Sequence, residues 1–93
     1  MKYEIRQTSR FKKDFKNIKK QNRNLRDFHY VIEKLANGER LEEKYKDHPL
    51  KGEYKDFREC HIAPDWLLIY LINDNVLTLT LSRTGSHSEL LDM

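Results

Sequence analysis

The sequence predicts an α+β fold in which an N-terminal helical hairpin packs on a small antiparallel sheet. Two observations support this prediction. Apolar residues recur at helical spacing between positions 11 and 35, whereas positions 57 to 82 switch to extended and alternating patterns. The expected order is β-α-α-β-β-β, closed by a short C-terminal helix. At 93 residues the chain has the length of one domain, and we expect residues 1–93 to form it.

The front of the chain supplies the first strand and the first helix. Residues 2–7 alternate, which predicts a short strand with Tyr3 and Ile5 on its buried face. Thr8 or Ser9 can cap the helix that follows. The apolar stripe of this helix, at spacing i, i+4, i+7, consists of Phe11, Phe15 and Ile18. Its lysines are expected to face solvent: Lys12, Lys13, Lys16, Lys19 and Lys20.

A second helix is predicted after a break at residues 21–24. Its apolar stripe consists of Leu25, Phe28, Ile32 and Leu35. Asn22 or Asn24 is a candidate N-cap, and Asn37-Gly38 is typical of a left-handed helix stop. Residues 39–46 are polar and without periodicity, which predicts a loop.

The second half of the chain predicts three strands. In the first, residues 57–62, alternation places Cys60 and Ile62 on one face and Glu59 and His61 on the other. The second, residues 66–72, is continuously apolar, which is typical of a central strand covered on both sides.

The third strand is predicted from the alternation of residues 76–82, with three leucines pointing inward: Leu77, Leu79 and Leu81. Turns at residues 63–65 and 73–75 should join the three strands into an antiparallel meander. Ser86-His87-Ser88-Glu89 then fits a capping box, which predicts a last short helix running through Leu91.

Composition excludes several classes of protein. Cys60 is the only cysteine, so the chain can form neither an internal disulfide nor a multi-cysteine zinc site. No N-terminal apolar run resembles a signal peptide or a membrane span. We therefore expect a cytoplasmic protein with no membrane partner.

The net charge of +3 hides an uneven distribution. Residues 1–37 contain eleven Lys or Arg against four Asp or Glu, whereas residues 38–93 contain seven against eleven. A basic half suits a polyanion such as nucleic acid, because cations that neutralise phosphates release counterions. The alternative is that the lysine-rich helices are solvated faces without a partner.

Three histidines lie in predicted turns or strand ends, and each has polar neighbours: His48, His61 and His87. Imidazole titrates near neutral pH, so histidines beside a carboxylate suit acid–base chemistry. Asp65, four residues after His61, can orient an imidazole or act as a base. Arg83, four residues before His87, can stabilise negative charge on a phosphate. Three further cations could contribute: Lys46, Lys51 and Arg58.

These residue types suit cleavage of RNA. That reaction needs a base for the 2′-hydroxyl proton, an acid for the leaving 5′-oxygen, and a cation for the phosphorane-like transition state. Three histidines and an aspartate could instead ligate zinc or iron. Because the sequence has no short HxH or HExxH spacing and the nearby cations oppose a metal, we expect no metal and no cofactor. A third interpretation is that His48 and His61 cap turns and Trp66 is only core.

The same residues resemble a known family. The motifs are Lys46-Asp47-His48-Pro49-Leu50-Lys51-Gly52, then Arg58-Glu59-Cys60-His61 with Pro64-Asp65-Trp66 and Tyr70, and finally Arg83-Thr84-Gly85-Ser86-His87. Together with the lysine-rich front, they resemble the YafQ branch of the RelE superfamily, the toxins of bacterial type II toxin–antitoxin pairs. The resemblance covers essentially the whole chain and implies a RelE-like fold.

The resemblance implies a ribosome-dependent mRNA interferase. Such an endoribonuclease enters the ribosomal A site and cuts the messenger, leaving a 2′,3′-cyclic phosphate and a free 5′-hydroxyl. The implied catalytic residues are His48, His61, Asp65, His87 and Arg83. His87 is expected to be the general acid, His48 or Asp65 the base, and Arg83 the phosphate-stabilising cation. His61 would orient the 2′-hydroxyl or share charge.

Three residues are expected to support this site: Glu59, Trp66 and Leu91. Glu59 stands where the family often has aspartate, and Leu91 stands where an aromatic residue is common, which argues against base stacking there. Contacts with RNA and the ribosome are expected from the basic residues Lys12, Lys13, Lys16, Lys19, Lys20, Lys51 and Arg58.

The implied partners are the 70S ribosome, messenger RNA and an acidic, partly disordered antitoxin. The free toxin is expected to be a monomer that becomes oligomeric with its antitoxin. The alternative function is a non-catalytic RNA- or partner-binding module that uses the same basic helices as a docking surface.

Overall fold

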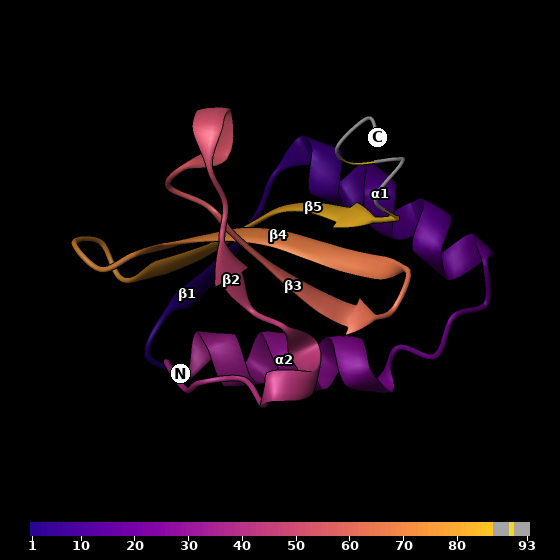
Figure 1. The fold of residues 1–93 in the computed structure, drawn as a ribbon, viewed down its shortest axis with the longest axis horizontal. Helices are drawn as coiled ribbons and strands as arrows, with labels where there is room; N and C mark the ends of the chain where they lie inside the picture. Colours follow the sequence, from indigo (N-terminus) through magenta and orange to yellow (C-terminus); the bar gives the residue numbers. More distant parts are fainter. Residues whose placement is uncertain (87–89, 91–93) are drawn as a thin grey trace.

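The computed structural model describes residues 1–86 and 90 of the chain, which form a sheet with two helices (Figure 1). In chain order the elements are β1 (Glu4–Gln7), α1 (Ser9–Lys20), α2 (Arg26–Ala36), the 3-10 turn η1 (Glu43–Tyr45), β2 (His48–Pro49), the 3-10 turn η2 (Gly52–Tyr54), β3 (Arg58–Ala63), β4 (Trp66–Asn73) and β5 (Thr78–Gly85). The α+β class and the expected order of helices and main strands are confirmed.

The sheet has the strand order β1-β5-β4-β3-β2. The predicted meander of β3, β4 and β5 is confirmed as antiparallel, and the two-residue strand β2 joins it next to β3. At the other edge β1 runs parallel to β5, from Glu4 opposite Thr78 to Gln7 opposite Leu81. The sheet is therefore mixed, whereas a purely antiparallel sheet was expected. The difference arises because the partner of β1 is the last strand, β5, and not a strand that follows β1 directly in the sequence.

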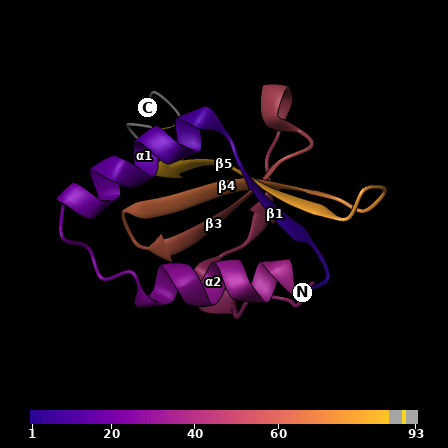
Figure 2. The same cartoon turned by 180° about the vertical axis from the view of Figure 1, so that it is seen from behind.

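Both helices cover one face of the sheet, which we call the helix face (Figure 2). The predicted stripes of the helices meet there, since the stacked rings of Phe11, Phe15 and Phe28 continue onto Trp66 of β4. Burying these rings removes a large apolar area from water, which is the main stabilising contribution to such a core.

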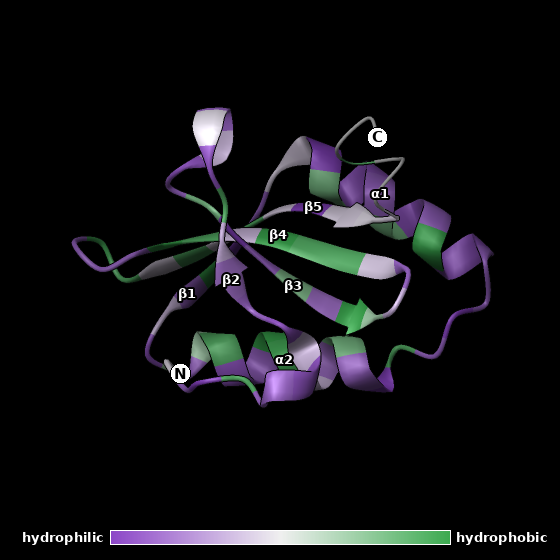
Figure 3. Ribbon diagram, in the orientation of Figure 1, coloured by the Kyte–Doolittle hydropathy of each residue, from purple (hydrophilic) through white to green (hydrophobic). Residues whose placement is uncertain are grey.

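Strand β4 is largely hydrophobic (Figure 3), and its first five residues, 66–70, are buried on both sides of the sheet, as the continuous apolar sequence predicted. Trp66, Leu68 and Tyr70 belong to the core under the helices. Leu67 and Ile69 point the other way and join Leu90, with Leu50 and Phe57 packed against them. We call this opposite side of the sheet the second face.

Capping residues in the sequence account for where the two helices begin and end. The Thr8 hydroxyl accepts a hydrogen bond from the backbone N–H of Phe11 at 3.0 Å, so Thr8 is the cap of α1. Helix α2 begins one residue later than expected, with Leu25 at the cap position and the Asn24 side chain accepting from the N–H of Arg26. Gly38 ends α2 at φ +76°, which confirms the left-handed stop.

The prediction that Leu77 points inward was wrong. The turn after β4 takes residues 74–77, and β5 begins at Thr78. The Asn73 side chain accepts from the backbone N–H of Asn75 at 3.0 Å and so stabilises this longer turn. Leu77 is consequently exposed with φ +48°, while Leu79 and Leu81 are buried as predicted.

The predicted C-terminal helix falls largely outside the described residues. Within the described part, the N–H of Leu90 donates to the carbonyl of Ser86 at 3.0 Å, which is the i to i−4 bond of a helical turn. In residues 1–86 and 90, no helix is long and apolar enough to cross a membrane.

Candidate active site

The candidate site is organised by one row of residues that crosses four strands. His48 on β2 lies opposite Glu59 on β3, and Glu59 lies opposite Ile69 on β4. Ile69 in turn lies opposite Arg83 on β5. Residues opposite one another in antiparallel strands project from the same face, so this row belongs with Ile69 to the second face. With strands about 4.8 Å apart, the backbones of His48 and Arg83 are roughly 14 Å apart.

His48 is held by a backbone carbonyl. Its Nδ1 lies 2.7 Å from the carbonyl oxygen of Lys46. Lys46 adopts a left-handed conformation, with φ 49° and ψ 43°, at the end of η1, so this short turn determines where the carbonyl sits. A carbonyl can only accept, which assigns the proton of the neutral ring to Nδ1 and leaves the lone pair on Nε2.

Glu59 lies between two imidazoles. Its Oε1 is 3.5 Å from Nε2 of His48 and 3.7 Å from Nε2 of His61. The two rings are 6.3 Å apart between centroids. The Glu59 side chain is 3% exposed, against 46% for His48, so a buried carboxylate supports an accessible imidazole. A carboxylate in this position stabilises the imidazolium that forms when Nε2 takes a proton.

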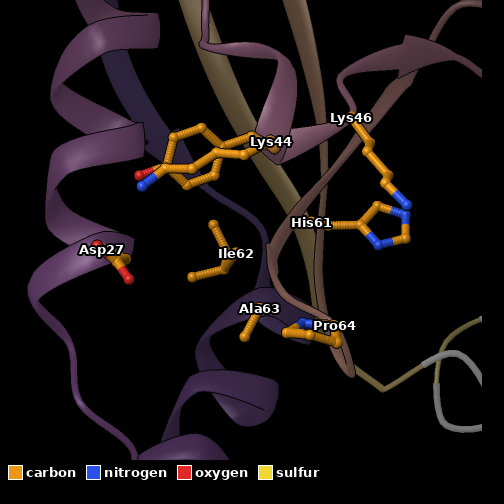
Figure 4. Close-up of a pocket in the computed structure, with 8 residues that line it drawn as sticks. Asp27, Lys44, Lys46, His61, Ile62, Ala63 and Pro64 are labelled. Carbon is orange, nitrogen blue, oxygen red and sulfur yellow. The ribbon is translucent and has the colours of Figure 1, made fainter.

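His61 also lines a cavity of about 370 Å³ between α2, η1 and the end of β3 (Figure 4). Lys46 extends along the same wall as the His61 ring, and Asp27 of α2 stands on the opposite wall. Ile62, Ala63 and Pro64 form the apolar part of the lining. The cavity therefore offers a cation, an imidazole and an apolar surface side by side.

Asp65 lies exposed in the turn between β3 and β4, one residue before Trp66. Within the part of the chain that the structure describes, no hydrogen bond or ion pair joins its carboxylate to His48 or His61. The structure thus places Asp65 at the end of the sheet near His61 but does not bring it into the carboxylate–imidazole group.

Trp66 is a structural support. It is buried, stacks on Phe28 with a centroid separation of 5.4 Å, and donates from Nε1 to the Thr84 hydroxyl at 2.8 Å. Thr84 in turn donates to the carbonyl of Leu67 at 2.8 Å. These bonds join the start of β4 to the end of β5, next to Arg83, and satisfy two buried polar groups.

Arg83 is paired with helix α1. Its Nε and Nη2 donate to the Asp14 carboxylate at 2.8 and 3.1 Å. Asp14 was not predicted from the sequence as a site residue. One signal could have found it, because Asp14 is the only acidic residue in a helix with six cationic ones.

Arg58 belongs to a second polar group, at the start of β3. It donates from Nε and Nη2 to Asp47 at 3.3 and 3.2 Å, and the Tyr70 hydroxyl also donates to Asp47. Burial lowers the pKa of Arg58, but the bonds to Asp47 and Tyr70 outweigh this and shift it upward. The Arg58 side chain remains 40% exposed beside this pair, and its predicted RNA-binding role stays a prediction.

The remaining predicted RNA contacts are accessible. The lysines that were predicted to contact RNA are all exposed: Lys12, Lys13, Lys16, Lys19, Lys20 and Lys51. Three of them line a groove of about 530 Å³ beside Arg83: Lys13, Lys16 and Lys20. Two predicted site residues, His87 and Leu91, lie outside the described residues.

The described residues provide no metal centre of the usual kind. Across positions 1–86 and 90, no group of three or more His, Cys, Asp or Glu side chains is placed to hold a metal ion. Nε2 of His48 and Nε2 of His61 both face the same carboxylate oxygen, Oε1 of Glu59.

The sequence and the fold match known proteins over almost their full length. Residues 3–92 match the family model described as bacterial toxin of type II toxin-antitoxin system, YafQ. The chain is 36% identical over 88 residues to the mRNA interferase toxin YafQ of Escherichia coli K12, covering 94% of each chain.

Solved structures of related toxins match the fold of this chain. The metal-bound toxin from Helicobacter pylori is 49% identical, with a TM-score of 0.89 over 97% of this chain and 99% of that chain. The YafQ toxin in the E. coli DinJ–YafQ complex is 36% identical, with a TM-score of 0.87 over 95% of this chain and 97% of that chain. Because both the family model and these relatives span nearly the whole chain, the protein belongs to the YafQ family of bacterial type II toxin–antitoxin toxins.

Proposed function

We propose that the protein is a ribosome-dependent mRNA endoribonuclease that cleaves messenger RNA in the ribosomal A site. The similarity to an mRNA interferase supports the reaction class. The observation that carries the proposal to this chain is the His48–Glu59–His61 group, in which one buried carboxylate lies within 3.7 Å of two imidazoles.

In the proposed reaction, the 2′-hydroxyl oxygen attacks the adjacent phosphorus and the bond from phosphorus to the 5′-oxygen breaks. The 2′-hydroxyl proton goes to the base, and the acid protonates the leaving 5′-oxygen. The products are a 2′,3′-cyclic phosphate and a free 5′-hydroxyl, with no change in oxidation state. No metal takes part in any of these steps.

His48 is the favoured base. Because Nδ1 donates to the Lys46 carbonyl, the lone pair on Nε2 is the group that can accept the 2′-hydroxyl proton. Glu59 then stabilises the imidazolium. Asp65, the other candidate, is exposed and stands outside this group. His61 lies beside the same carboxylate and shares the positive charge of the His48 imidazolium through it. Arg83 stabilises the negative charge that develops on the phosphate. His87, outside the described residues, is proposed as the acid on the resemblance alone.

The proposed partners are supported by the positive charge of α1 and by the structure of a related toxin. The exposed lysines of α1 suit ribosomal RNA, and a complex of a related toxin with DinJ supports neutralisation by an antitoxin. We propose that residues 1–93 act as one domain, monomeric when free, in the cytoplasm.

Metal independence is a part of the proposal that needs its own test, because related toxins from Helicobacter pylori have metal-bound structures. Cleavage that persists at full rate after exhaustive chelation would support it. Loss of cleavage on chelation, with recovery on adding back one metal, would overturn it.

The main experiment compares the wild type with His48→Ala in a purified translation system and maps the 5′ ends of the messenger. We expect cuts within codons only when ribosomes translate, and a fall of about a hundredfold or more in His48→Ala, as for loss of a general base. His29→Ala is the matched control, because His29 is an exposed histidine on α2. Wild-type protein that produces no new ends on translated messenger would contradict the proposal.

The second candidate function is a non-catalytic binding module, favoured by the basic groove beside α1. It predicts the opposite pattern of variants. Substitution of Lys12, Lys13 and Lys16 would abolish translation arrest, whereas His48→Ala and His61→Ala would leave it intact.

A further inference from the structure

An acidic residue, Asp14, lies in the basic groove beside α1, where a further cation would be expected. Among residues 1–86 and 90, the groove beside α1 is lined by Arg10, Lys13, Lys16, Asn17, Lys20 and Arg83, and the carboxylate that these residues contribute to it is that of Asp14. A negative charge among cations weakens attraction for a phosphate backbone. Its position therefore needs an explanation other than binding of a polyanion.

The contacts of Asp14 supply that explanation. Its Oδ2 accepts from Nε of Arg83 at 2.8 Å and from the backbone N–H of Thr84 at 3.1 Å, and its Oδ1 accepts from Nη2 of Arg83 at 3.1 Å. Two parallel bonds to a guanidinium set its plane as well as its position. The third bond ties the same carboxylate to the backbone next to Arg83.

Helix α1 is firmly placed against this part of β5. Strand β1 pairs only with Thr78–Leu81, so the later residues of β5 lie beyond the pairing of β1. The Thr8 hydroxyl donates to the carbonyl of Ser82 at 2.7 Å, and the N–H of Thr8 donates to Leu81 at 3.1 Å. Phe11 and Ile18 anchor the helix in the core. Asp14 thus stands on a rigid element, as a residue that orients a functional group should.

The pair is also largely shielded from solvent. The side chains of Arg83 and Asp14 are 18% and 14% exposed. An ion pair held this far from water is screened less by salt than one on the open surface. The orientation of the Arg83 guanidinium is therefore set within the free protein.

We propose that Asp14 is a positioning residue for Arg83, which holds the guanidinium in the orientation that meets the reacting phosphate. This inference rests on the proposed nuclease function. An arginine that is oriented before the phosphate arrives needs no ordering at the moment of reaction, which is how preorganised charge accelerates such a step. Asp14 acts through Arg83 and touches neither substrate nor reacting atoms.

The test is a double-mutant cycle on the full-length chain, with single-turnover cleavage of ribosome-bound messenger as the readout. Asp14→Ala is expected to lower the cleavage rate about tenfold without weakening binding to ribosomes, in line with loss of a group that orients a functional residue. In an Arg83→Ala background, Asp14→Ala should change the rate less than about twofold, because the residue it positions is gone. Asp56→Asn is the matched control, an exposed carboxylate distant in sequence from both.

A second variant keeps the test valid if Asp14→Ala fails to fold. Asp14→Asn retains an oxygen for the Thr84 N–H but loses the charge, so it should keep the melting temperature and still lower the rate. An unchanged or faster rate in a folded Asp14 variant would overturn the inference, since it would mean that Asp14 merely opposes phosphate binding. An equal loss with and without Arg83 would also overturn it. If Arg83→Ala alone leaves cleavage unchanged, the proposed role of Arg83 and this inference fail together, while His48→Ala still tests the nuclease function.

Discussion

Nε2 of His48 lies 3.5 Å from the carboxylate of Glu59, its direct neighbour across the β2–β3 pair. Strand β2 is only two residues long, so its pairing with β3 is what brings the accessible imidazole to the buried carboxylate. Glu59, in the interior of the sheet, therefore sets the environment of the His48 ring at the edge of the sheet. The same carboxylate reaches His61, so one substitution at Glu59 should affect both imidazoles.

Glu59→Gln is expected to separate activity from stability. The glutamine keeps the size of the side chain but removes the charge that stabilises an imidazolium, so cleavage should fall at least about tenfold. The melting temperature should stay within a few degrees of the wild type or rise, because a buried charge costs solvation free energy. Thermal unfolding and single-turnover cleavage measure the two effects.

The control for this substitution is Glu53→Gln, which removes an exposed carboxylate on η2. It should change neither quantity. A Glu59→Gln variant that cleaves at the wild-type rate would show that the carboxylate is only a structural partner of the histidines.

Thr84→Val is expected to destabilise the fold at the end of β5. Valine has the shape of threonine, but it leaves the buried N–H of Trp66 and the carbonyl of Leu67 without the hydroxyl that joins them. The expected loss is about 2 kcal/mol in the free energy of unfolding, measured by urea denaturation. Thr80→Val, at a partly exposed position of the same strand, is the control and should cost much less. Equal costs at the two positions would contradict the assigned role of Thr84.

The parts of the fold that the sequence predicted are those with a local signal. The stripe of Phe11, Phe15 and Ile18, the cap at Thr8 and the stop at Gly38 each depend on residues a few positions apart, and each is confirmed. Strand β2 was missed because two residues carry no periodicity, and its pairing with β3 is decided by tertiary structure.

The candidate site shows the same division. The grouping of His48, His61 and Glu59 was partly predictable, because residue types and strand alternation identified each member. The pairing of Arg83 with Asp14 joins positions 69 residues apart, and no local pattern links them. The sequence likewise predicts Arg58 only as a cation, and the fold shows that it pairs with Asp47.

Tyr70→Phe is expected to change how stability depends on pH. Burial first, and then the hydrogen bond to Asp47, raises the pKa of Tyr70 above its ordinary value of 10.0. Above about pH 10 the unfolded chain ionises this phenol while the folded protein does not, so wild-type stability should fall as pH rises, by up to about 1.4 kcal/mol per pH unit. The variant should lose about 1 kcal/mol at pH 7 and show a shallower alkaline decline.

Denaturant unfolding at several pH values between 7 and 11 measures this effect. Tyr54→Phe, on η2 and partly exposed, controls for removal of a phenol as such. An alkaline decline of the same slope in Tyr70→Phe and in the wild type would contradict the assignment to Tyr70.

The thiol of Cys60 is expected to be unreactive until the protein unfolds. Its side chain is fully buried in the core under the helices, and burial raises the pKa of the thiol well above its ordinary value of 9.0, with Asp47 and Glu59 adding to the shift. Since the thiolate is the reactive form, a disulfide reagent at pH 8 should label the native protein only at the rate at which it opens, and label it at once in denaturant. Cys60→Ser should be less stable than Cys60→Ala, because a buried hydroxyl needs a hydrogen-bond partner that an apolar site does not supply. Rapid labelling of the native protein, with a rate independent of denaturant, would show that β3 is accessible and that this part of the core is not closed.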